Sequence, residues 1–307
     1  MIKLSISKKE LTILKTIIEK HHTTATTLAE ATHTPPQSIS RYITQLEEKG
    51  FITTKKEGVT KTITIAETPH ALLIRKQILE NEHMNLEPIT NTGMKILLTI
   101  NCLNLTSWEE VMKYAGVSYR ALRPKMNQFT SMGLVIKEKN YEINPRLQII
   151  KEFLQKYNEY IQAKEIKKIA EDATIKWCCG DTSIFETENK LTLPTTGISA
   201  FQEYGAIFYT IKNLYIKTKQ RNLKLEDHII NHIHSEKTSN ILPLLITWKL
   251  NEKNIDTKYL QKQAYLQKIP EIINSIIKYL DSEGKTRTDY QPPWNEFIAK
   301  YRDYSNE

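Results

Sequence analysis

The 307-residue sequence predicts a mainly helical α+β fold, in which two small modules precede a larger mixed α+β domain. Three observations support this organisation. Residues 5–66 contain three segments with the apolar spacing of helices, followed by alternating β-branched and polar residues. The same pattern recurs 83 residues further along the chain. After residue 172, short strand-like runs precede a series of helical segments.

The most informative element is a predicted helix over residues 35–49. Pro35 and Pro36 suit the first turn of a helix, and Gly50 suits its end. Its apolar residues recur at spacings of three and four and form one stripe: Ile39, Ile43 and Leu46. The remaining face is short and polar: Gln37, Ser38, Ser40, Arg41, Thr44 and Gln45. A solvated surface helix usually carries more Glu and Lys, so this face favours a helix that enters the DNA major groove.

The flanking segments complete a winged helix-turn-helix. Ser7 to Lys20 predicts an amphipathic helix that opens with a capping box between Ser7 and Glu10. Thr26 to Ala31 predicts a short second helix, and His33-Thr34 the turn into the third. Residues 51–66 alternate in the manner of a hairpin around Glu57-Gly58. Helix, helix, helix and hairpin is the order of a winged helix-turn-helix, here over residues 1–68.

This segment resembles a known family. Residues 5–66 are similar to the winged-helix domains of MarR-like and related archaeal and bacterial transcription regulators. The resemblance rests on the residues of 38–43 (SISRYI) and 46–52 (LEEKGFI). It implies DNA binding. We expect DNA contacts from the turn and the third helix, at Thr34, Gln37, Ser38, Ser40, Arg41, Thr44 and Gln45, with base contacts from Gln37 and Arg41. We expect phosphate contacts from the wing, at Lys55, Lys56 and Lys61.

A second module of the same kind is expected at residues 90–145. Pro69 opens a linking helix, His70 to about Leu86, within the segment 69–89. Beyond it, a shift of 83 residues without a gap superposes the apolar and glycine positions: Leu11 on Met94, Leu14 on Leu97, Ile17 on Ile100, Leu28 on Val111, Ile43 on Met126, Leu46 on Phe129 and Gly50 on Gly133. The second wing, Val135 to Asn144, is shorter and turns at Lys139-Asn140.

The second module departs from the first at Pro124, which falls on the position of Arg41. A proline inside a helix costs about 3 kcal/mol and kinks it, unless the helix begins at Arg123 with Pro124 in its first turn. Arg120, Arg123 and Lys125 still supply three positive charges. We therefore expect phosphate contact or a packing role here, with less base reading than in the first module.

A long connecting helix is predicted from Pro145 to about Ala170, within 146–171. Its apolar residues alternate spacings of three and four: Leu147, Ile150, Leu154, Tyr157 and Ile161. Two interpretations fit this seam. It can dock on the C-terminal domain of the same chain, or it can form a dimer with a second copy.

Residues 172–307 predict an α+β domain for dimerisation, sensing or partner binding. The expected elements are strands at 173–179, 183–187 and 209–217, a short helix at 195–205, and helices at 226–234, 239–252, 257–268, 270–281 and from Trp294. The segment 196–201 (TGISAF), followed by Tyr204-Gly205, loosely resembles the C-terminal domain of AbiEi-type antitoxins, which also carry an N-terminal winged helix.

Signals for chemistry are few. His228 and His232 share a helix face and could chelate a metal ion, with Asp227 or His234 as a third ligand. We expect instead that they are partly exposed and make local hydrogen bonds. The three cysteines, Cys102, Cys178 and Cys179, are expected to be reduced and buried. Phosphate-loop, dinucleotide and hydrolase motifs do not occur, so we expect neither an enzyme nor a cofactor.

Charge and hydropathy agree with a DNA partner. The net charge is +8, and residues 1–66 hold ten Lys/Arg against six Asp/Glu. Residues 88–145 hold seven against four. Such an excess suits a polyanion. We find no signal-peptide pattern or membrane-length apolar run, so we expect a cytoplasmic protein without a membrane partner.

The sequence thus predicts a sequence-specific double-stranded DNA-binding transcription regulator, acting as a repressor and homodimer on an inverted repeat. A small effector could bind the C-terminal domain. The alternative is an antitoxin that represses its own operon and binds a toxin through that domain. A replication or RNA-binding factor is the third hypothesis.

Overall fold

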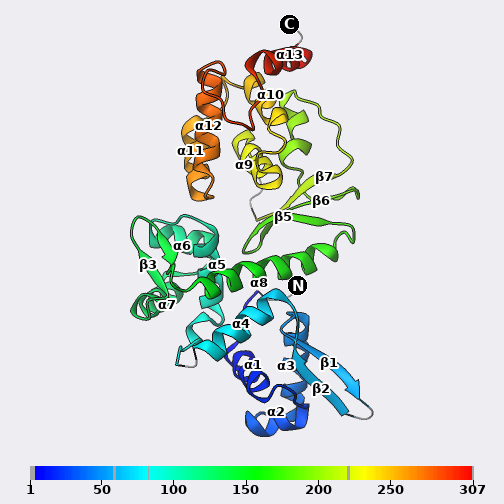
Figure 1. Cartoon of the computed structure of the whole chain (residues 1–307), viewed down its shortest axis with the longest axis vertical. Helices are drawn as coiled ribbons and strands as arrows, with labels where there is room; N and C mark the ends of the chain where they lie inside the picture. The colour runs from blue at the N-terminus through cyan, green and yellow to red at the C-terminus, as the bar shows by residue number, and fades with distance from the viewer. Residues whose placement is uncertain (1–3, 58–59, 82, 220–221, 306–307) are drawn as a thin grey trace. The chain divides into compact units, whose positions relative to one another are not determined.

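The computed structural model describes residues 4–57, 60–81, 83–219 and 222–305 (Figure 1). These divide into two compact units at the boundary between Glu165 and Ile166. The elements are mainly helical, with three small antiparallel sheets over the described residues, which confirms the expected α+β class. None of the described helices combines the length and apolarity that a bilayer crossing requires.

The first module has the expected order of elements. It consists of α1 (Lys8–Lys20), α2 (Ala25–Ala31), α3 (Pro36–Glu48), β1 (Ile52–Glu57) and β2 (Thr60–Ile65). The predicted capping box is present, because the Ser7 hydroxyl accepts from the Glu10 amide and the Glu10 carboxylate accepts from the Ser7 amide. Gly50 ends α3 with a positive φ of 72°. The wing turn expected at Glu57-Gly58 falls on Gly58, which lies outside the described residues.

The linking helix is shorter than expected. α4 (Pro69–Glu80) opens at the proline but ends at Glu80, six residues before the predicted end. A short helical turn, η1 (Glu87–Ile89), follows. Leu86 and Ile89 are buried. Asn81 leaves the helical conformation, with φ −133° and ψ 56°, so the helix stops before it.

Residues 92–143 repeat the element order of the first module. They form α5 (Thr92–Cys102), α6 (Trp108–Ala115), α7 (Tyr119–Ser131), β3 (Val135–Lys137) and β4 (Tyr141–Ile143). Both ends of α7 lie 83 residues after those of α3. The alternative in which this helix begins at Arg123 is wrong, because Pro124 lies inside α7. Pro124 is on the exposed side, where the bond that its missing N–H forfeits is open to water.

The long helix α8 (Gln148–Lys167) begins three residues after Pro145. Its seam residues Ile150, Leu154, Tyr157 and Ile161 are fully buried. The Tyr157 ring lies 5.2 Å from that of Phe51 and 5.4 Å from that of His70, measured between centroids. The seam therefore packs on the first module and α4, a partner that neither sequence interpretation anticipated. A seam already buried within its own chain is not free for a second copy, so its interpretation as a dimer contact is wrong.

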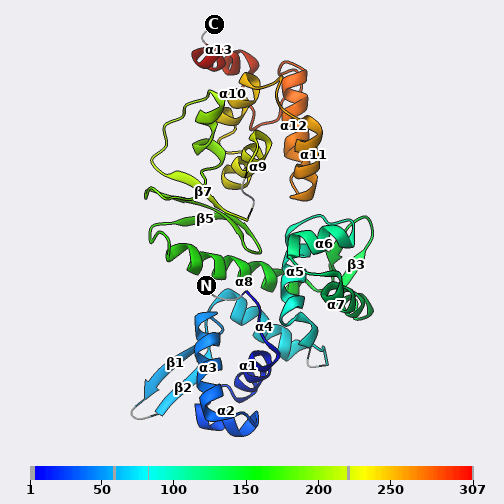
Figure 2. The ribbon, with the colours of Figure 1, turned by 180° about the vertical axis from the view of Figure 1, so that it is seen from behind.

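The second unit, whose ribbon is seen from behind in Figure 2, contains the three-stranded sheet. Its order is β5 (Thr174–Cys179), β6 (Thr182–Thr187), β7 (Asn213–Lys217). β5 is only half-buried, although its apolar run predicted a buried strand. The short helix expected at 195–205 is a pair of 3-10 turns, η2 (Gly197–Ser199) and η3 (Phe201–Tyr204). The expected strand 209–217 begins only at Asn213.

Five helices follow the sheet in this unit. They are α9 (Leu225–Glu236), α10 (Leu242–Leu250), α11 (Thr257–Leu266), α12 (Pro270–Asp281) and α13 (Trp294–Ser305). Their core includes Ile229, Leu244, Ile273, Tyr279 and Phe297, all fully buried. Of the three cysteines, Cys178 and Cys179 lie on β5 and Cys102 ends α5. All three are half-buried, so the expectation of burial is wrong.

Candidate nucleic-acid interface

The rotation of α3 is set by its apolar stripe. Ile39, Ile43 and Leu46 are buried in the core of the first module. Because a helix repeats every 3.6 residues, the opposite face must point outward. The side chains exposed on that face include Gln37, Ser40, Arg41 and Thr44, four of the residues predicted to contact DNA, and Glu48 at the last turn.

The hydroxyls on this face are already oriented. Ser40 Oγ donates to the Pro36 carbonyl at 3.2 Å, and Thr44 Oγ1 donates to the Ser40 carbonyl at 3.1 Å. With its proton committed to the backbone, each hydroxyl presents acceptor lone pairs to the outside. Such a face accepts hydrogen bonds from base amino groups or from water.

Arg41 supplies the only positive charge on the exposed face of α3. Its guanidinium lies 5.1 Å from the Tyr42 ring centroid, and Nη2 donates to the Tyr42 hydroxyl at 3.4 Å. Four of the five guanidinium N–H donors are not used by this bond. No sequence pattern predicted this contact with Tyr42, because neighbouring residues of a helix do not usually face each other.

Three other predicted positions lie differently. Ser38 and Gln45 are half-buried and, being seven residues apart, lie along one edge of the face. Thr34 is only 8% exposed, and its hydroxyl donates to the Thr32 carbonyl at 3.0 Å. Thr34 thus holds the turn before α3 and does not belong to the exposed face. The structure brings together the helix residues but not the turn residue.

The wing presents its lysines to solvent. Lys56 and Lys61 are direct partners in the β1–β2 register, and Lys55 pairs with Thr62. All three lysine side chains are exposed. Two like charges at one cross-strand position repel each other, and an anion between them would relieve that repulsion. This is the arrangement expected for phosphate contact.

Lys49 does not contribute to the positive surface. It is 5% exposed, and its ammonium pairs with the Glu10 carboxylate and donates to the Ser5 carbonyl at 2.9 Å. This buried pair joins the end of α3 to the start of α1. The role of Lys49 is therefore structural. A count of charges in the sequence could not distinguish this buried lysine from an exposed one.

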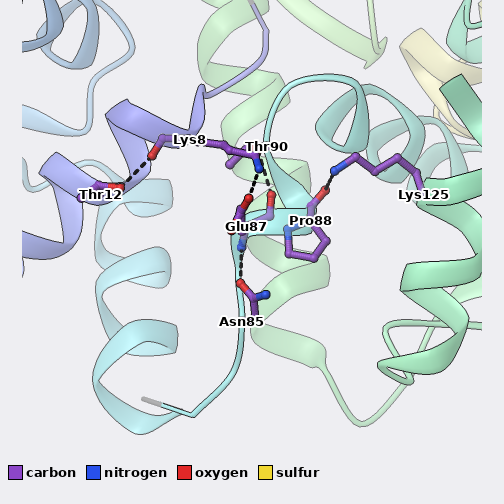
Figure 3. A network of polar contacts seen from close by, with 7 residues as sticks. All are labelled: Lys8, Thr12, Asn85, Glu87, Pro88, Thr90 and Lys125. Carbon is purple, nitrogen blue, oxygen red and sulfur yellow. Dashed lines mark hydrogen bonds and ion pairs between the residues drawn. The ribbon is translucent and has the colours of Figure 1, made fainter.

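On the second module, the predicted cations separate into two groups. Arg120 and Arg123 are exposed on α7. Lys125 is half-buried, and its Nζ donates to the Pro88 carbonyl at 3.1 Å (Figure 3). Burial lowers the pKa of Lys125, and the nearby positive charge of Lys8 lowers it further. Lys125 is therefore a packing residue, one of the two roles predicted for this cluster.

Figure 3 shows the polar network in which Lys125 takes part. The Lys8 ammonium of α1 pairs with the Glu87 carboxylate of η1, and this hydrogen bond and charge hold the pKa of Glu87 below its usual value. Lys125 of α7 reaches the next residue of η1. The network thus connects the first module, the linker and the second module.

The histidines of α9 face different partners. His228 Nδ1 lies 3.1 Å from Thr196 Oγ1, and His232 Nε2 lies 2.8 Å from the Asn240 carbonyl. His234 stacks on Trp177 with centroids 4.5 Å apart. Burial lowers the pKa of each of these histidines to about 4. The expectation of partly exposed histidines is wrong for His228 and His232, and within the described ranges no metal-binding cluster of His, Cys, Asp and Glu occurs.

Comparison with known proteins agrees with the geometry of the first module. Residues 6–53 match a family described as winged helix-turn-helix DNA-binding. This segment is a winged helix-turn-helix DNA-binding domain, as predicted, and it implies a DNA partner. The chain matches neither a curated protein nor a solved structure.

Proposed function

We propose that the chain is a sequence-specific double-stranded DNA-binding transcription regulator that reads the major groove with α3. One observation carries the proposal: the outward face of α3 holds Gln37, Arg41 and two oriented hydroxyls on a rotation set by its buried stripe. Arg pairs with the guanine edge through two hydrogen bonds, and Gln does the same with adenine. The Lys56/Lys61 pair of the wing is suited to the adjoining phosphates.

The decisive test is selection of binding sites from random duplex DNA by the full-length chain, followed by sequencing. We expect a recurring motif, and affinity for it roughly 10³-fold or more above that for scrambled DNA at physiological salt. The same titrations use single-stranded DNA and double-stranded RNA of matched length. Enrichment of no motif, or tighter binding to either of those probes, would replace the proposal with the replication or RNA-binding hypothesis.

We also propose that α5, α6, α7 and the β3–β4 hairpin act as a second winged helix. The supporting observations are the matching element order and the common offset of α3 and α7. Exposed Arg120 and Arg123 place positive charge on its outward face. Each lysine or arginine that meets a phosphate contributes about 0.9 to the slope of log affinity against log salt.

A second candidate function is an antitoxin that represses its own operon and binds a toxin through the second unit. Ile207, Tyr209 and Ile211 favour it, because they alternate along the segment before β7 and are 58%, 99% and 89% exposed. Exposed apolar side chains at alternate positions suit pairing with a partner chain. Co-expression with the product of the adjacent gene tests this: a stable complex that the Tyr209→Asp chain does not form supports the antitoxin function.

We still propose that the chain binds an inverted repeat as a homodimer. The α8 seam does not form the contact between the two copies. Sedimentation of the full chain, free and with selected DNA, measures the stoichiometry. Two chains per site support the homodimer, whereas one chain per site removes it.

A further inference from the structure

We propose that α7 is a second base-reading helix, coupled rigidly to α3, so that one chain reads a composite DNA site. This rests on the proposed function of duplex DNA binding. It goes further by assigning base contacts to Arg120, Arg123 and Asn127, where the sequence led us to expect mainly phosphate contact or packing.

The first step concerns the face of α7. Leu122, Met126 and Phe129 are buried, and they lie 83 residues after the buried stripe of α3. The two helices therefore have the same rotation within their modules. Arg120, Arg123 and Asn127 are exposed on α7 at the positions that Gln37, Ser40 and Thr44 occupy on α3. The continuity of α7 through Pro124 keeps all three on one face.

The second step concerns their chemistry. Arginine makes paired hydrogen bonds to guanine, and asparagine makes them to the N6 and N7 atoms of adenine. The Asn127 side chain adds both a donor and an acceptor, which is what the paired contact with adenine requires. Pro124 presents an exposed apolar ring at the position of Arg41. An apolar group in the groove suits the thymine methyl, so the two helices prefer different bases.

The third step is the coupling between the modules. Asn91 at the start of α5 donates its backbone N–H to the Ile6 carbonyl at 2.8 Å. Lys8 and Lys125 hold η1 from both sides (Figure 3). Apolar side chains from α1, α4, η1, α5 and α8, and from the residues just before α1 and η1, line one small apolar pocket: Ile6, Leu11, Ile74, Leu86, Ile89, Met94 and Phe153. Modules that share an interior cannot reorient independently.

A rigid pair of reading helices requires a fixed spacing between the two parts of the site. B-DNA turns once in about 10–10.5 base pairs, so inserting five base pairs moves one part to the opposite side of the duplex. A flexible pair of modules would follow the displaced part, whereas this chain would lose the contacts of one helix.

The experiment uses the full-length chain and site selection from random duplex DNA. The variants are Arg41→Ala, Asn127→Ala and the double variant Arg120→Ala/Arg123→Ala. Lys151→Ala/Lys156→Ala is the charge-matched control, because both lysines are exposed on α8. We expect a two-part motif, in which Arg41→Ala relaxes one part and the α7 variants relax the other. A five-base-pair insertion should lower affinity at least roughly 10-fold, and the control should retain the wild-type motif.

The outcomes separate the two proposals. If the α7 variants lower only the salt slope and leave the motif unchanged, α7 contacts phosphate alone and this inference is overturned. Tolerance of the insertion overturns the rigid coupling. In both cases a weaker and altered motif with Arg41→Ala preserves the proposed function, whereas no effect of Arg41→Ala would count against that function itself. The substituted side chains are exposed, so unchanged thermal unfolding verifies that each variant is folded.

Discussion

Among single residues, burial distinguishes the basic side chains that are available to a ligand from those that stabilise the fold. Arg41 and Lys49 are both basic and both belong to the α3 region, yet Arg41 is exposed beside Tyr42 and Lys49 is buried against Glu10. A charge that is already paired in the interior adds little to the field outside, because its partner cancels it. We therefore expect the charge of the first module that meets DNA to come from Arg41 and the wing lysines.

Arg41→Ala should weaken binding to the selected site by roughly 1–3 kcal/mol and relax the preference at one base pair. The physical reason is the loss of a two-bond contact to a guanine edge. Fluorescence anisotropy with specific and scrambled duplexes measures both quantities. Arg41→Lys is the matched control, because it keeps the charge but not the paired donors. An unchanged ratio of specific to scrambled affinity in Arg41→Ala would exclude base reading by Arg41.

Replacing Lys55, Lys56 and Lys61 together by Ala should weaken all duplexes similarly. The slope of log affinity against log salt should fall by about one unit for each lysine that neutralises a phosphate. Titrations at several salt concentrations give the slope. A triple variant that retains the wild-type slope would show that the wing does not contact phosphate.

Among the elements, α8 packs into the core of the first unit. Its aromatic side chains cover Phe51 and His70, which lie at the end of the reading region and the start of the linking helix. Gly50 lies directly beneath α8, since a Cβ there would overlap the Tyr160 ring. The helix that looked like a connector is thus part of the core that positions α3.

Two equivalent glycines allow this packing to be measured. Gly50 and Gly133 follow α3 and α7 at equivalent positions with positive φ, of 72° and 65°. At Gly133 the nearest atom to an added Cβ is Asn144 Nδ2, 3.9 Å away. Gly133→Ala should cost only the backbone strain, roughly 1–2 kcal/mol, whereas Gly50→Ala adds an overlap that must displace Tyr160.

Urea unfolding of the two variants gives the comparison. We expect the larger loss of stability for Gly50→Ala, and Gly50→Ala combined with Tyr160→Ala should recover part of it. Equal losses in the two glycine variants would be inconsistent with the close packing of α8 on Gly50.

At the scale of the whole molecule, the two units differ in their titratable interiors. The second unit contains His228, His232 and His234 and the first contains His70, and burial lowers the pKa of each from 6.5 to about 4. The unfolded chain binds protons on these groups below pH 6.5, whereas the folded chain does so only near pH 4. The contribution of these histidines to the free energy of unfolding is therefore complete above pH 6.5, and it is lost as the pH falls from 6.5 to 4.

Lowering the pH from 7.5 to 4.5 should consequently destabilise the second unit more than the first, with each histidine contributing at most roughly 3 kcal/mol. Trp177, Trp248 and Trp294 lie in the second unit and Trp108 in the first. Thermal unfolding followed by tryptophan fluorescence therefore reports mainly on the second unit. The His234→Gln chain should show a smaller shift in midpoint between these pH values, and an identical shift would rule out His234 as a contributor.

Short-range patterns in the sequence predicted the local structure and the outward face of α3. Three features are encoded within a few turns or a few strand residues: the spacing of Ile39, Ile43 and Leu46, the stop at Gly50 and the alternation in the wing. The same apolar and glycine pattern recurs at an offset of 83 residues. Local spacing therefore predicted the winged helix over the segment that the family match covers, and it also predicted α9 to α13 to within a few residues.

Only the tertiary structure decided which surfaces meet. The burial of Lys49, Thr34 and the α9 histidines, the early end of α4 and the attachment of Lys125 to Pro88 depend on residues up to dozens of positions away. The seam of α8 is the clearest case, since its spacing specified an apolar face but not the partner. Apolar burial is non-directional, so a stripe predicts that something covers it, and the three-dimensional packing of Phe51 and His70 determines what does.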